Sequence, residues 1–381
     1  MAVRWPAGVA SSGVAAGIKP AGDADLGLVA LGRPAAWAGT FTRSGAAAAP
    51  VTWSRGLLGR SLRAIVVNSG NANACTGAAG EHAVAATVRA AASRLGCAPE
   101  EVAVASTGPI GVRLPVKNVV SGIPRAVAGL TPDVAPFADA ILTTDTRRKV
   151  SRRVEDGFEV VGVGKGAAML APNMATMLAF LATDAVAATE DLQGILTRAV
   201  RTTFDRISVD ACQSTNDSVF LVASGTAGEA DPGRLEAAVA AVCADLAEQM
   251  VRDAEGGSKL VRIRVTGAPT EEHAEDLARG VAASALWRAA VHGADPNWGR
   301  IAAALGALDP ALDMRGVSLA IGPEVVFEAG EPAGSLPEAA AAMASGDVVV
   351  SCTVGPHPTE VELLTTDLSP EYVTLNAGGM S

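Results

Sequence analysis

The chain has 381 residues and a net charge of −10, and its composition is 49% hydrophobic but only 3% aromatic. A chain of this length can bury a substantial core, and the shortage of aromatic rings predicts that Ala, Val, Leu and Ile fill it. The acidic balance, without any run of Lys or Arg, argues against nucleic acid and anionic membranes as partners.

The cysteines and the apolar segments indicate the compartment in which such a chain works. The five cysteines are scattered and form no Cys-x-x-Cys pair, so neither a disulfide framework nor a zinc site is expected. Charged residues interrupt every apolar stretch before about eighteen residues, which argues against a membrane span. The N-terminal residues also lack the apolar core of a signal peptide. These features predict a soluble cytoplasmic protein.

Glycine, proline and the spacing of apolar residues predict the elements of the first half. Residues 1–60 read as loops and short strands, with brief apolar runs at Leu26–Leu31 and Val51–Trp53. The elements expected after them are a strand at Arg63–Val67, a helix at Glu81–Leu95 ended by Gly96, a strand at Val102–Ala105, a tight turn at residues 106–111, a helix at Phe137–Ile141, and a hairpin of Lys149–Val154 with Phe158–Val163.

The second half alternates irregularly between helix and strand. The expected elements are an apolar stretch at Met177–Leu181, helices at Glu190–Thr203, Pro232–Arg252, Glu272–Ala290 and Pro337–Ala344, and strands at Ser218–Val222, Leu260–Val265, Val317–Ile321 and Val348–Val354. No repeat of about 20–50 residues is present. The pattern predicts an α/β or α+β fold with mixed sheets.

The most unusual segment is residues 162–178, which read Gly-Val-Gly-Lys-Gly-Ala-Ala-Met-Leu-Ala-Pro-Asn-Met-Ala-Thr-Met-Leu. The Gly-Lys-Gly run suggests a phosphate-binding loop. However, no Gly stands at the required spacing before Lys165, and no Ser or Thr follows it, so that pattern fails. By residue type alone the segment is equally well a plain loop that leads into a buried strand or helix.

The same segment resembles the signature of the ornithine acetyltransferases, the glutamate N-acetyltransferases of arginine biosynthesis, in which a Met-Ala-Thr run follows a Lys-Gly pair. The resemblance extends along essentially the whole chain. Its further blocks stand in the family's order at residues 16–19, 41–43, 49–51, 68–73, 106–111, 143–146, 214–217 and 292–300.

In that family the bond before the Thr is cut autocatalytically, which implies a cut here between Ala175 and Thr176. The cut would give an α chain of residues 1–175 and a β chain of residues 176–381 that begins with the nucleophile. Cleavage frees an α-amine, with an ordinary pKa of about 8, beside a weakly nucleophilic hydroxyl. One residue would therefore supply both nucleophile and base, and the acetyl group would be carried on the Thr176 oxygen.

The resemblance also implies roles for residues elsewhere in the chain. Thr107 and Gly108 match the oxyanion-hole pair, since a hydroxyl and a backbone amide can both donate to a developing oxyanion. Thr143 and Lys165 match substrate-contacting residues, and Glu255 matches the acidic partner of the ornithine amine. By residue type alone, Thr107–Gly108 would be an ordinary turn. Lys165 would be a solvated lysine, and Glu255 a solvated carboxylate.

The C-terminal tail departs from the family pattern. Asn376 matches a substrate-binding Asn, and Ser381 stands where a substrate-binding Thr is usual. The family tail usually reads Asn-Ala-x-Tyr-Thr-Thr, whereas residues 376–381 read Asn-Ala-Gly-Gly-Met-Ser, without the aromatic residue. If the tail closes over the substrate side chain, this departure affects the recognition of ornithine. We expect His292, which invites a catalytic role, to be structural.

The resemblance implies a self-cleaving acyltransferase that moves acetyl from N2-acetylornithine to glutamate through an acetyl-Thr176 intermediate. Two alternatives stay open: a paralogue of specialised metabolism that acylates a different amino acid or uses a different acyl donor, and an N-terminal-nucleophile amidohydrolase or aminopeptidase. The implied fold is α/β, an aminopeptidase/ornithine-acetyltransferase-like sandwich of mixed sheets flanked by helices. Paired α and β chains (α2β2) and no metal or redox cofactor are implied, with acetyl-CoA as an alternative donor.

Overall fold

The computed structural model describes residues 2–170 and 177–377, which form two compact units. The first unit comprises residues 2–170, 177–205 and 212–250, and the second comprises residues 206–211 and 251–377. Each unit has a sheet of its own. The predicted cut after residue 175 falls within the first unit and does not coincide with the division between the units.

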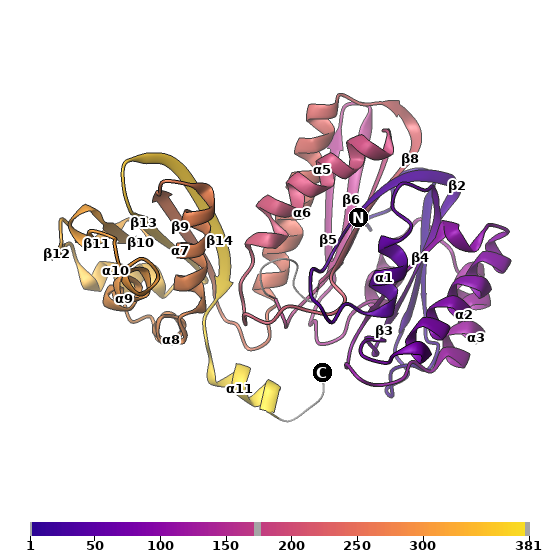
Figure 1. Ribbon diagram of the computed structural model, residues 1–381, viewed down its shortest axis with the longest axis horizontal. Helices are drawn as coiled ribbons and strands as arrows, with labels where there is room; N and C mark the ends of the chain where they lie inside the picture. The colour runs from indigo at the N-terminus through magenta and orange to yellow at the C-terminus, as the bar shows by residue number, and fades with distance from the viewer. Residues whose placement is uncertain (1, 171–176, 378–381) are drawn as a thin grey trace. The chain divides into compact units, whose positions relative to one another are not determined.

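An eight-stranded sheet organises the first unit, in the order β4-β3-β2-β8-β7-β6-β5 with β1 beside β2 (Figure 1). The pairs β3–β4 and β7–β8 are parallel and the other pairs are antiparallel, so the sheet is mixed. Its strands are β1 (Val9–Val14), β2 (Leu26–Phe41), β3 (Leu62–Ser69), β4 (Val102–Thr107), β5 (Lys149–Glu155), β6 (Phe158–Lys165), β7 (Leu178–Val186) and β8 (Ser218–Glu229).

The long strand β2 joins the two halves of this sheet. Its first part, Leu26–Ala30, pairs with β3, and its last part, Ala36–Phe41, pairs with β8. Side chains from both halves, such as Ile65 of β3 and Phe180 of β7, belong to one buried core. The ring of Phe137 fills that core with its centroid 5.0 Å from the ring of Phe180. The two halves therefore face each other as the layers of a sandwich.

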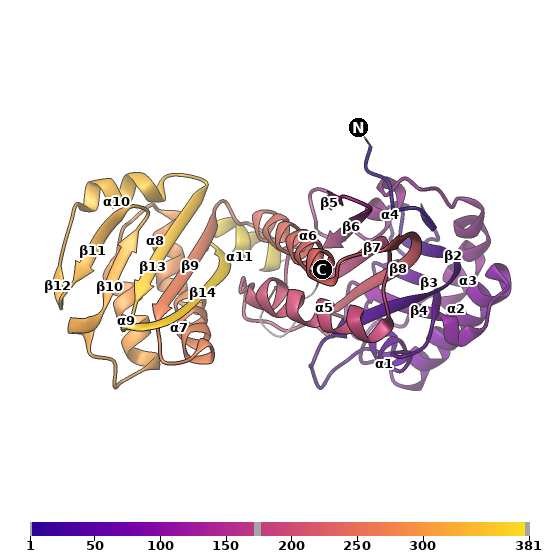
Figure 2. The ribbon, with the colours of Figure 1, turned by 90° about the horizontal axis from the view of Figure 1, so that it is seen from above.

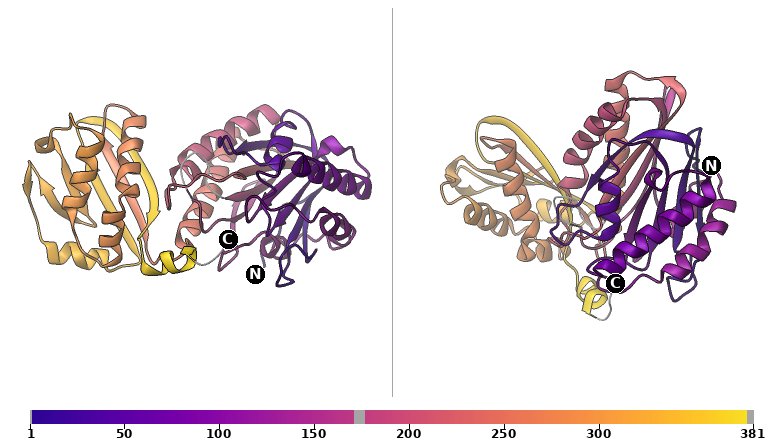
Figure 3. Two further views of the ribbon diagram at one scale, coloured as in Figure 1. Left: turned by 60° about the horizontal axis from the view of Figure 1, so that its bottom comes forward. Right: turned by 45° about the vertical axis from the view of Figure 1, so that its right-hand side comes forward.

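Helices cover both outer faces of the sandwich. Val88 of α2 and Ile123 of α3 pack on one half through a second core, and these two helices lie side by side (Figures 1 and 3). On the other half, Gly162 of β6 approaches α6 so closely that an added Cβ would lie 2.6 Å from Val242. The helices are α1 (Ala49–Arg55), α2 (Ala78–Leu95), α3 (Val116–Ala128), α4 (Ala135–Ala140), α5 (Thr189–Thr202) and α6 (Pro232–Arg252). This arrangement confirms the predicted α/β sandwich of mixed sheets flanked by helices.

The second unit is built on a six-stranded sheet in the order β12-β11-β10-β13-β9-β14 (Figure 2). Apolar side chains of the helices, among them Leu277, Trp287 and Ile301, form its core with the strands. The strands are β9 (Leu260–Gly267), β10 (Ser318–Ile321), β11 (Glu324–Glu328), β12 (Glu331–Pro332), β13 (Asp347–Thr353) and β14 (His357–Thr366). The helices are α7 (Glu271–Ala283), α8 (Ala285–His292), α9 (Trp298–Leu308), α10 (Leu336–Met343) and α11 (Pro370–Ala377).

Most predicted elements are confirmed, but two expectations are wrong. Residues 1–60 are not only loops and short strands, because β2 continues through the exposed residues 32–34 and α1 covers the apolar run at Val51–Trp53. The single helix expected at Glu272–Ala290 is two helices, since Ser284 accepts a hydrogen bond from the Trp287 amide and starts α8 as its N-cap. Among the described residues, no helix is both long and apolar enough to cross a bilayer.

Candidate active site

Strand β4 ends at the predicted oxyanion pair, Thr107 and Gly108. Strands β3 and β4 run parallel, so their ends lie side by side, and the Asn71 amide just after β3 donates to the Thr107 carbonyl at 3.0 Å. Gly108 has a φ of +136°, and a Cβ there would lie 2.4 Å from the Asn71 nitrogen. Only glycine tolerates both the dihedral and the contact, so the sequence dictates the shape of this turn.

Lys165, the last residue of β6, reaches this turn with its ammonium group. Its Nζ donates to the hydroxyl of Thr143 at 2.7 Å and to the hydroxyl of Thr107 at 3.3 Å. Lys165 is 2% exposed and Thr107 is 1% exposed, so Lys165 is not the solvated lysine that its residue type alone suggests. Three of the predicted site residues therefore form one hydrogen-bonded group, with Gly108 adjacent in the chain.

Asp145 and Lys149, two residues to which the sequence analysis gave no role, complete this group. The Lys149 Nζ donates to Asp145 Oδ1 at 2.6 Å, and the Lys165 Nζ lies 3.6 Å from Asp145 Oδ2. Burial by itself raises the pKa of Asp145, but the charges of Lys165 and Lys149 and a hydrogen bond from the Gly166 amide outweigh it and lower the pKa well below its usual range. Asp145 therefore stays ionised between two buried ammonium groups.

A second buried carboxyl group, that of Asp217, holds Met177, the residue that follows the predicted nucleophile Thr176. The Met177 amide donates to Asp217 Oδ1 at 3.0 Å. Burial raises the pKa of Asp217 well above its usual range, although hydrogen bonds from Met177 and Ser214 and the charge of Lys165 oppose the rise. Since Lys165 pairs with Leu178 across β6 and β7, the fixed Met177 lies at the strand end next to Lys165.

We expect Asp217→Asn to stabilise the fold at neutral and alkaline pH. An aspartate whose pKa is raised by folding favours the folded state fully below its unfolded pKa of about 3.9, and this contribution is lost as the pH rises through the folded pKa. Asn stays neutral, and its Oδ1 can still accept from the Met177 amide. In urea unfolding of the uncut Thr176→Ala chain, the gain in midpoint should grow as the pH is raised from about 4 to about 8.

The matched variant Asp217→Ala removes the acceptor as well as the charge. It leaves the buried Met177 amide without a partner, so it should cost about 1–3 kcal/mol relative to Asp217→Asn. A gain in the urea midpoint of Asp217→Asn that does not vary with pH would contradict the raised pKa of Asp217.

Glu255, predicted to pair with the amine of ornithine, and Asn376, predicted to bind the substrate, meet in the second unit. Asn376 on α11 donates through Nδ2 to Glu255 Oε2 at 3.0 Å. Gly256 has a φ of +67°, and a Cβ there would lie 2.3 Å from the Tyr372 nitrogen, so this loop packs closely against α11. The other oxygen of Glu255, Oε1, is buried and accepts no hydrogen bond from any described residue. Glu255 therefore offers a buried acceptor for a further donor.

His292 lies in the second unit as well, and its contacts agree with the structural role expected for it. Its Nδ1 lies 2.7 Å from Oδ2 of the buried Asp367. Asp367 also accepts hydrogen bonds from the backbone amides of Ser258 and Lys259. His292 thus helps to anchor the start of β9 to the end of β14.

The predicted residues fall into three sets. Thr107, Gly108, Thr143 and Lys165 come together in the first unit, and Glu255 and Asn376 come together in the second. Ala175, Thr176 and Ser381 lie outside the described residues, so their predicted roles stay predictions.

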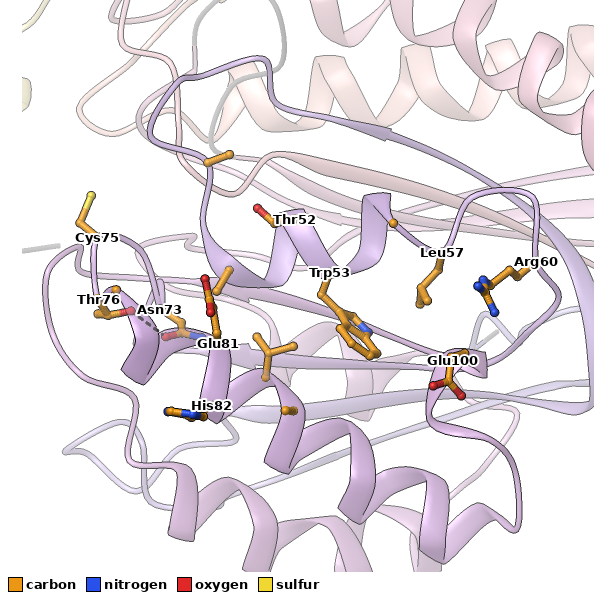
Figure 4. A pocket seen from close by; sticks show the side chains of 16 residues that line it. Thr52, Trp53, Leu57, Arg60, Asn73, Cys75, Thr76, Glu81, His82 and Glu100 are labelled. Atoms are coloured by element: carbon orange, nitrogen blue, oxygen red, sulfur yellow. Dashed lines mark hydrogen bonds between the residues drawn. The ribbon is translucent and has the colours of Figure 1, made fainter.

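A cavity of about 800 Å³ opens between α1 and α2 of the first unit (Figure 4). Trp53 lines it from α1, His82 lines it from α2, and Cys75 lies at one end, where the hydroxyl of Thr76 donates to Asn73 Oδ1 at 3.1 Å. Of the predicted site residues that the structure describes, none lines this cavity.

Known proteins match the chain over nearly its whole length. The model of the ArgJ family matches residues 10–380. The arginine biosynthesis bifunctional protein ArgJ of Thermus thermophilus is 45% identical, and the match covers 99% of each chain. The protein of the same name from Streptomyces avermitilis is 47% identical over 84% of this chain and 85% of its own.

Among solved structures, the ornithine acetyltransferase of Mycobacterium tuberculosis, complexed with ornithine, is 42% identical, with a TM-score of 0.43 over 45% of this chain and 94% of that chain. The family resemblance found in the sequence is confirmed by the extent of the family match and by the identity to the Thermus relative. The chain therefore belongs to the ArgJ family.

Proposed function

We propose that the chain is a self-cleaving acetyltransferase of arginine biosynthesis. The Thr176 hydroxyl attacks the Ala175 carbonyl, the peptide bond opens to an ester, and water hydrolyses the ester to leave Thr176 as a new N-terminus. In turnover the same hydroxyl attacks the acetyl carbonyl of N2-acetylornithine, the amide bond breaks, and ornithine leaves with the proton that Thr176 gives up. The glutamate α-amine then attacks the acetyl-Thr176 ester, which releases N-acetylglutamate and restores the hydroxyl.

The observation that carries this proposal is the position of Met177, the residue bonded to Thr176. Met177 is held by Asp217 and directly precedes β7, whose first residue, Leu178, pairs with Lys165. Lys165 in turn donates to the Thr107 hydroxyl at the end of β4. We therefore assign the hydroxyl of Thr107 and the amide of Gly108 as the donors to the tetrahedral oxyanion of this reaction. The names of the relatives, which refer to arginine biosynthesis, support the same activity.

Each chemical task in the scheme has a residue to perform it. The Thr176 α-amine, with an ordinary pKa of about 8, takes the hydroxyl proton as general base. Thr107 and Gly108 stabilise the oxyanion, and the loss of one such donor typically lowers the rate by about 10²–10³. None of these steps uses a metal or a redox group, so we propose that the enzyme works without a cofactor, with acetyl-CoA as the alternative acetyl donor.

For the amine end of ornithine the scheme uses Glu255. Its buried Oε1 accepts no hydrogen bond from a described residue, while Oε2 accepts one from Asn376. An ammonium–carboxylate hydrogen bond contributes about 1.5–3 kcal/mol, so Glu255→Gln should raise the KM for N-acetylornithine about tenfold to hundredfold in steady-state kinetics. The kcat should change little, because the bond lies at the far end of the substrate side chain from the acetyl group.

The control for this variant is Glu371→Gln, on the exposed surface of α11. We expect its KM to equal that of the unmutated protein. An unchanged KM in Glu255→Gln would contradict the proposed role of Glu255.

Intact-mass analysis tests the proposed function directly. The purified protein should appear as fragments 1–175 and 176–381, and incubation with N-acetylornithine should add the mass of one acetyl group to the second fragment only. Addition of glutamate should then remove that acetyl group as N-acetylglutamate. Acetylation by acetyl-CoA alone would point to a different donor, and loss of the acetyl group to water at the same rate with and without glutamate would point to a hydrolase. A single uncut chain would contradict the proposal.

We further propose that the cut chains remain paired as α2β2 in the cytoplasm. Strand β6 would belong to the α chain and β7 to the β chain. The antiparallel pairing of Val160–Lys165 with Leu178–Thr183 supports an α–β pair that persists after cleavage.

A further inference from the structure

Asp145 collects hydrogen-bond donors from several parts of the first unit. The Thr143 amide donates to its Oδ2 at 3.2 Å, while the Gly166 amide and the Lys149 Nζ donate to its Oδ1 at 2.7 Å and 2.6 Å. The Lys165 Nζ lies 3.6 Å from Oδ2. One carboxylate therefore fixes the backbone of a predicted substrate-contacting residue and the ammonium group of another.

The group that Asp145 organises is buried and carries a net charge. The side chains of Asp145 and Lys149 are 0% exposed, and that of Lys165 is 3% exposed. Two positive charges and one negative charge leave a net charge of +1 next to the Thr107 hydroxyl. A positive charge held away from water interacts strongly with negative charge that develops nearby, because water screens it little.

The direction of the hydrogen bond between Lys165 and Thr107 matters for the oxyanion. An ammonium group can only donate, so the Thr107 oxygen accepts from Lys165, and the hydroxyl proton of Thr107 remains available for another acceptor. A Lys165 that moved away would let the Thr107 hydroxyl turn, and the donor to the oxyanion would be lost. The carboxylate that holds Lys165 in place thus controls the donor.

We propose that Asp145 is a positioning residue for acyl transfer: it anchors Lys165 so that the Lys165 ammonium orients the Thr107 hydroxyl towards the oxyanion, and Lys149 balances its charge. The proposal rests on the acetyl transfer proposed above. In this role Asp145 acts through Lys165 and Thr107 and takes no part in the bonds that form and break.

The test compares Asp145→Asn with the double variant Asp145→Asn/Lys149→Met. The single variant leaves two buried ammonium groups without their carboxylate, so one of them should lose its proton at a lower pH than in the unmutated protein. Among the described residues, the titratable groups around Lys165 include Asp145, Lys149, Lys19 and Asp217, and the variant leaves the last three unchanged. We expect the rate of Thr176 acetylation to fall about 10²-fold, the effect of losing one oxyanion donor, and the deficit to widen as the pH rises from about 6 to about 9.

The double variant separates positioning from charge balance. It keeps a net charge of +1, carried by Lys165 alone, and it removes the repulsion that would hinder folding of the single variant. We expect its pH profile to return to that of the unmutated protein while its rate stays at least about tenfold lower. Recovery of the rate to that of the unmutated protein would overturn the proposal, because it would show that Asp145 only neutralises charge. Asp139→Asn, which removes the exposed partner of Arg148, is the matched control and should leave the rate unchanged.

A crystal structure of the double variant provides a readout that needs no activity. If Asp145 anchors Lys165, the Lys165 Nζ should lie beyond hydrogen-bond distance of the Thr107 hydroxyl in the variant. An Nζ still bonded to Thr107 would overturn the proposal, whatever donor the enzyme uses. An unmutated protein that is not acetylated by N-acetylornithine would instead contradict the proposed function, and the Lys165 position in the variant would still decide the role of Asp145.

Discussion

Replacing Thr176 with alanine is expected to leave one uncut chain of 381 residues that takes no acetyl group from N-acetylornithine. Self-cleavage and acetyl transfer use the same hydroxyl, and alanine has none, so both should fall to the background rate rather than by the factor of about 10²–10³ typical of a lost oxyanion donor. Intact-mass analysis before and after incubation with the donor measures both events in one sample.

The control for this variant is Thr176→Ser, which keeps a hydroxyl beside an α-amine. It should still cleave and still gain an acetyl group. Thermal unfolding should be cooperative in both variants, as in the unmutated protein, so that loss of chemistry is separated from loss of fold. Acetylation of Thr176→Ala at the rate of the unmutated protein would show that another residue carries the acetyl group.

The second large effect is expected from Gly108→Ala. Gly108 has a φ of +136°, and the new Cβ would lie 2.4 Å from the Asn71 nitrogen and 2.6 Å from the Gly70 carbonyl carbon. Both atoms belong to the peptide bond between Gly70 and Asn71, which cannot move aside as a side chain can, so the turn itself must move. That movement displaces the Gly108 amide and the Thr107 hydroxyl together, and the acetylation rate in single-turnover assays should fall by at least about 10³.

A glycine in the same turn provides the matched control. Gly111 also has a left-handed backbone, with a φ of +82°, but nothing lies within 4 Å of the position that its Cβ would occupy. Gly111→Ala should therefore cost about 1–2 kcal/mol of stability from backbone strain alone, with the acetylation rate nearly unchanged. Equal losses of activity in the two variants would show that any strain in this turn is damaging, and would contradict a specific role for Gly108.

Local signals account for the parts of the fold that the sequence predicted well. The predicted helix Pro232–Arg252 coincides with α6, because helical spacing of apolar residues is a property of the segment itself. The strand β2 was hidden because its exposed residues 32–34 separate two parts that pair with different neighbours. The break at Ser284 was hidden because the apolar spacing continues on both sides of it. The first miss depends on strand partners that the segment does not encode, whereas the second is a local N-cap that the apolar spacing does not reveal.

The site residues also divide into those that a local sequence pattern predicts and those that only three-dimensional contacts reveal. Thr107, Gly108 and Lys165 stand in short blocks that resemble a family, so they could be predicted by position. Lys149 could not, because at the start of a hairpin strand it reads as a solvated charge, and its burial follows from Asp145 and from the sheet around it. The motif at residues 143–146 contains Asp145, yet a motif does not show which backbone amides and ammonium groups converge on one carboxylate. Asp217 was missed in the same way, since its partner Met177 is remote in sequence.

The shared sheet of the first unit has a consequence for how the protein could be remade after denaturation. Strands β6 and β7 are neighbours within one chain before the proposed cut, so the precursor can close this pairing in a step that involves a single molecule. After the cut the same pairing must be made by two separate polypeptides, and its rate then depends on their concentration. The precursor would refold readily from dilute solution, whereas the mature protein, once its chains had separated, would recover slowly or not at all. Cleavage would in this way turn a chain that refolds reversibly into a two-chain protein that does not readily reassemble once its chains have separated.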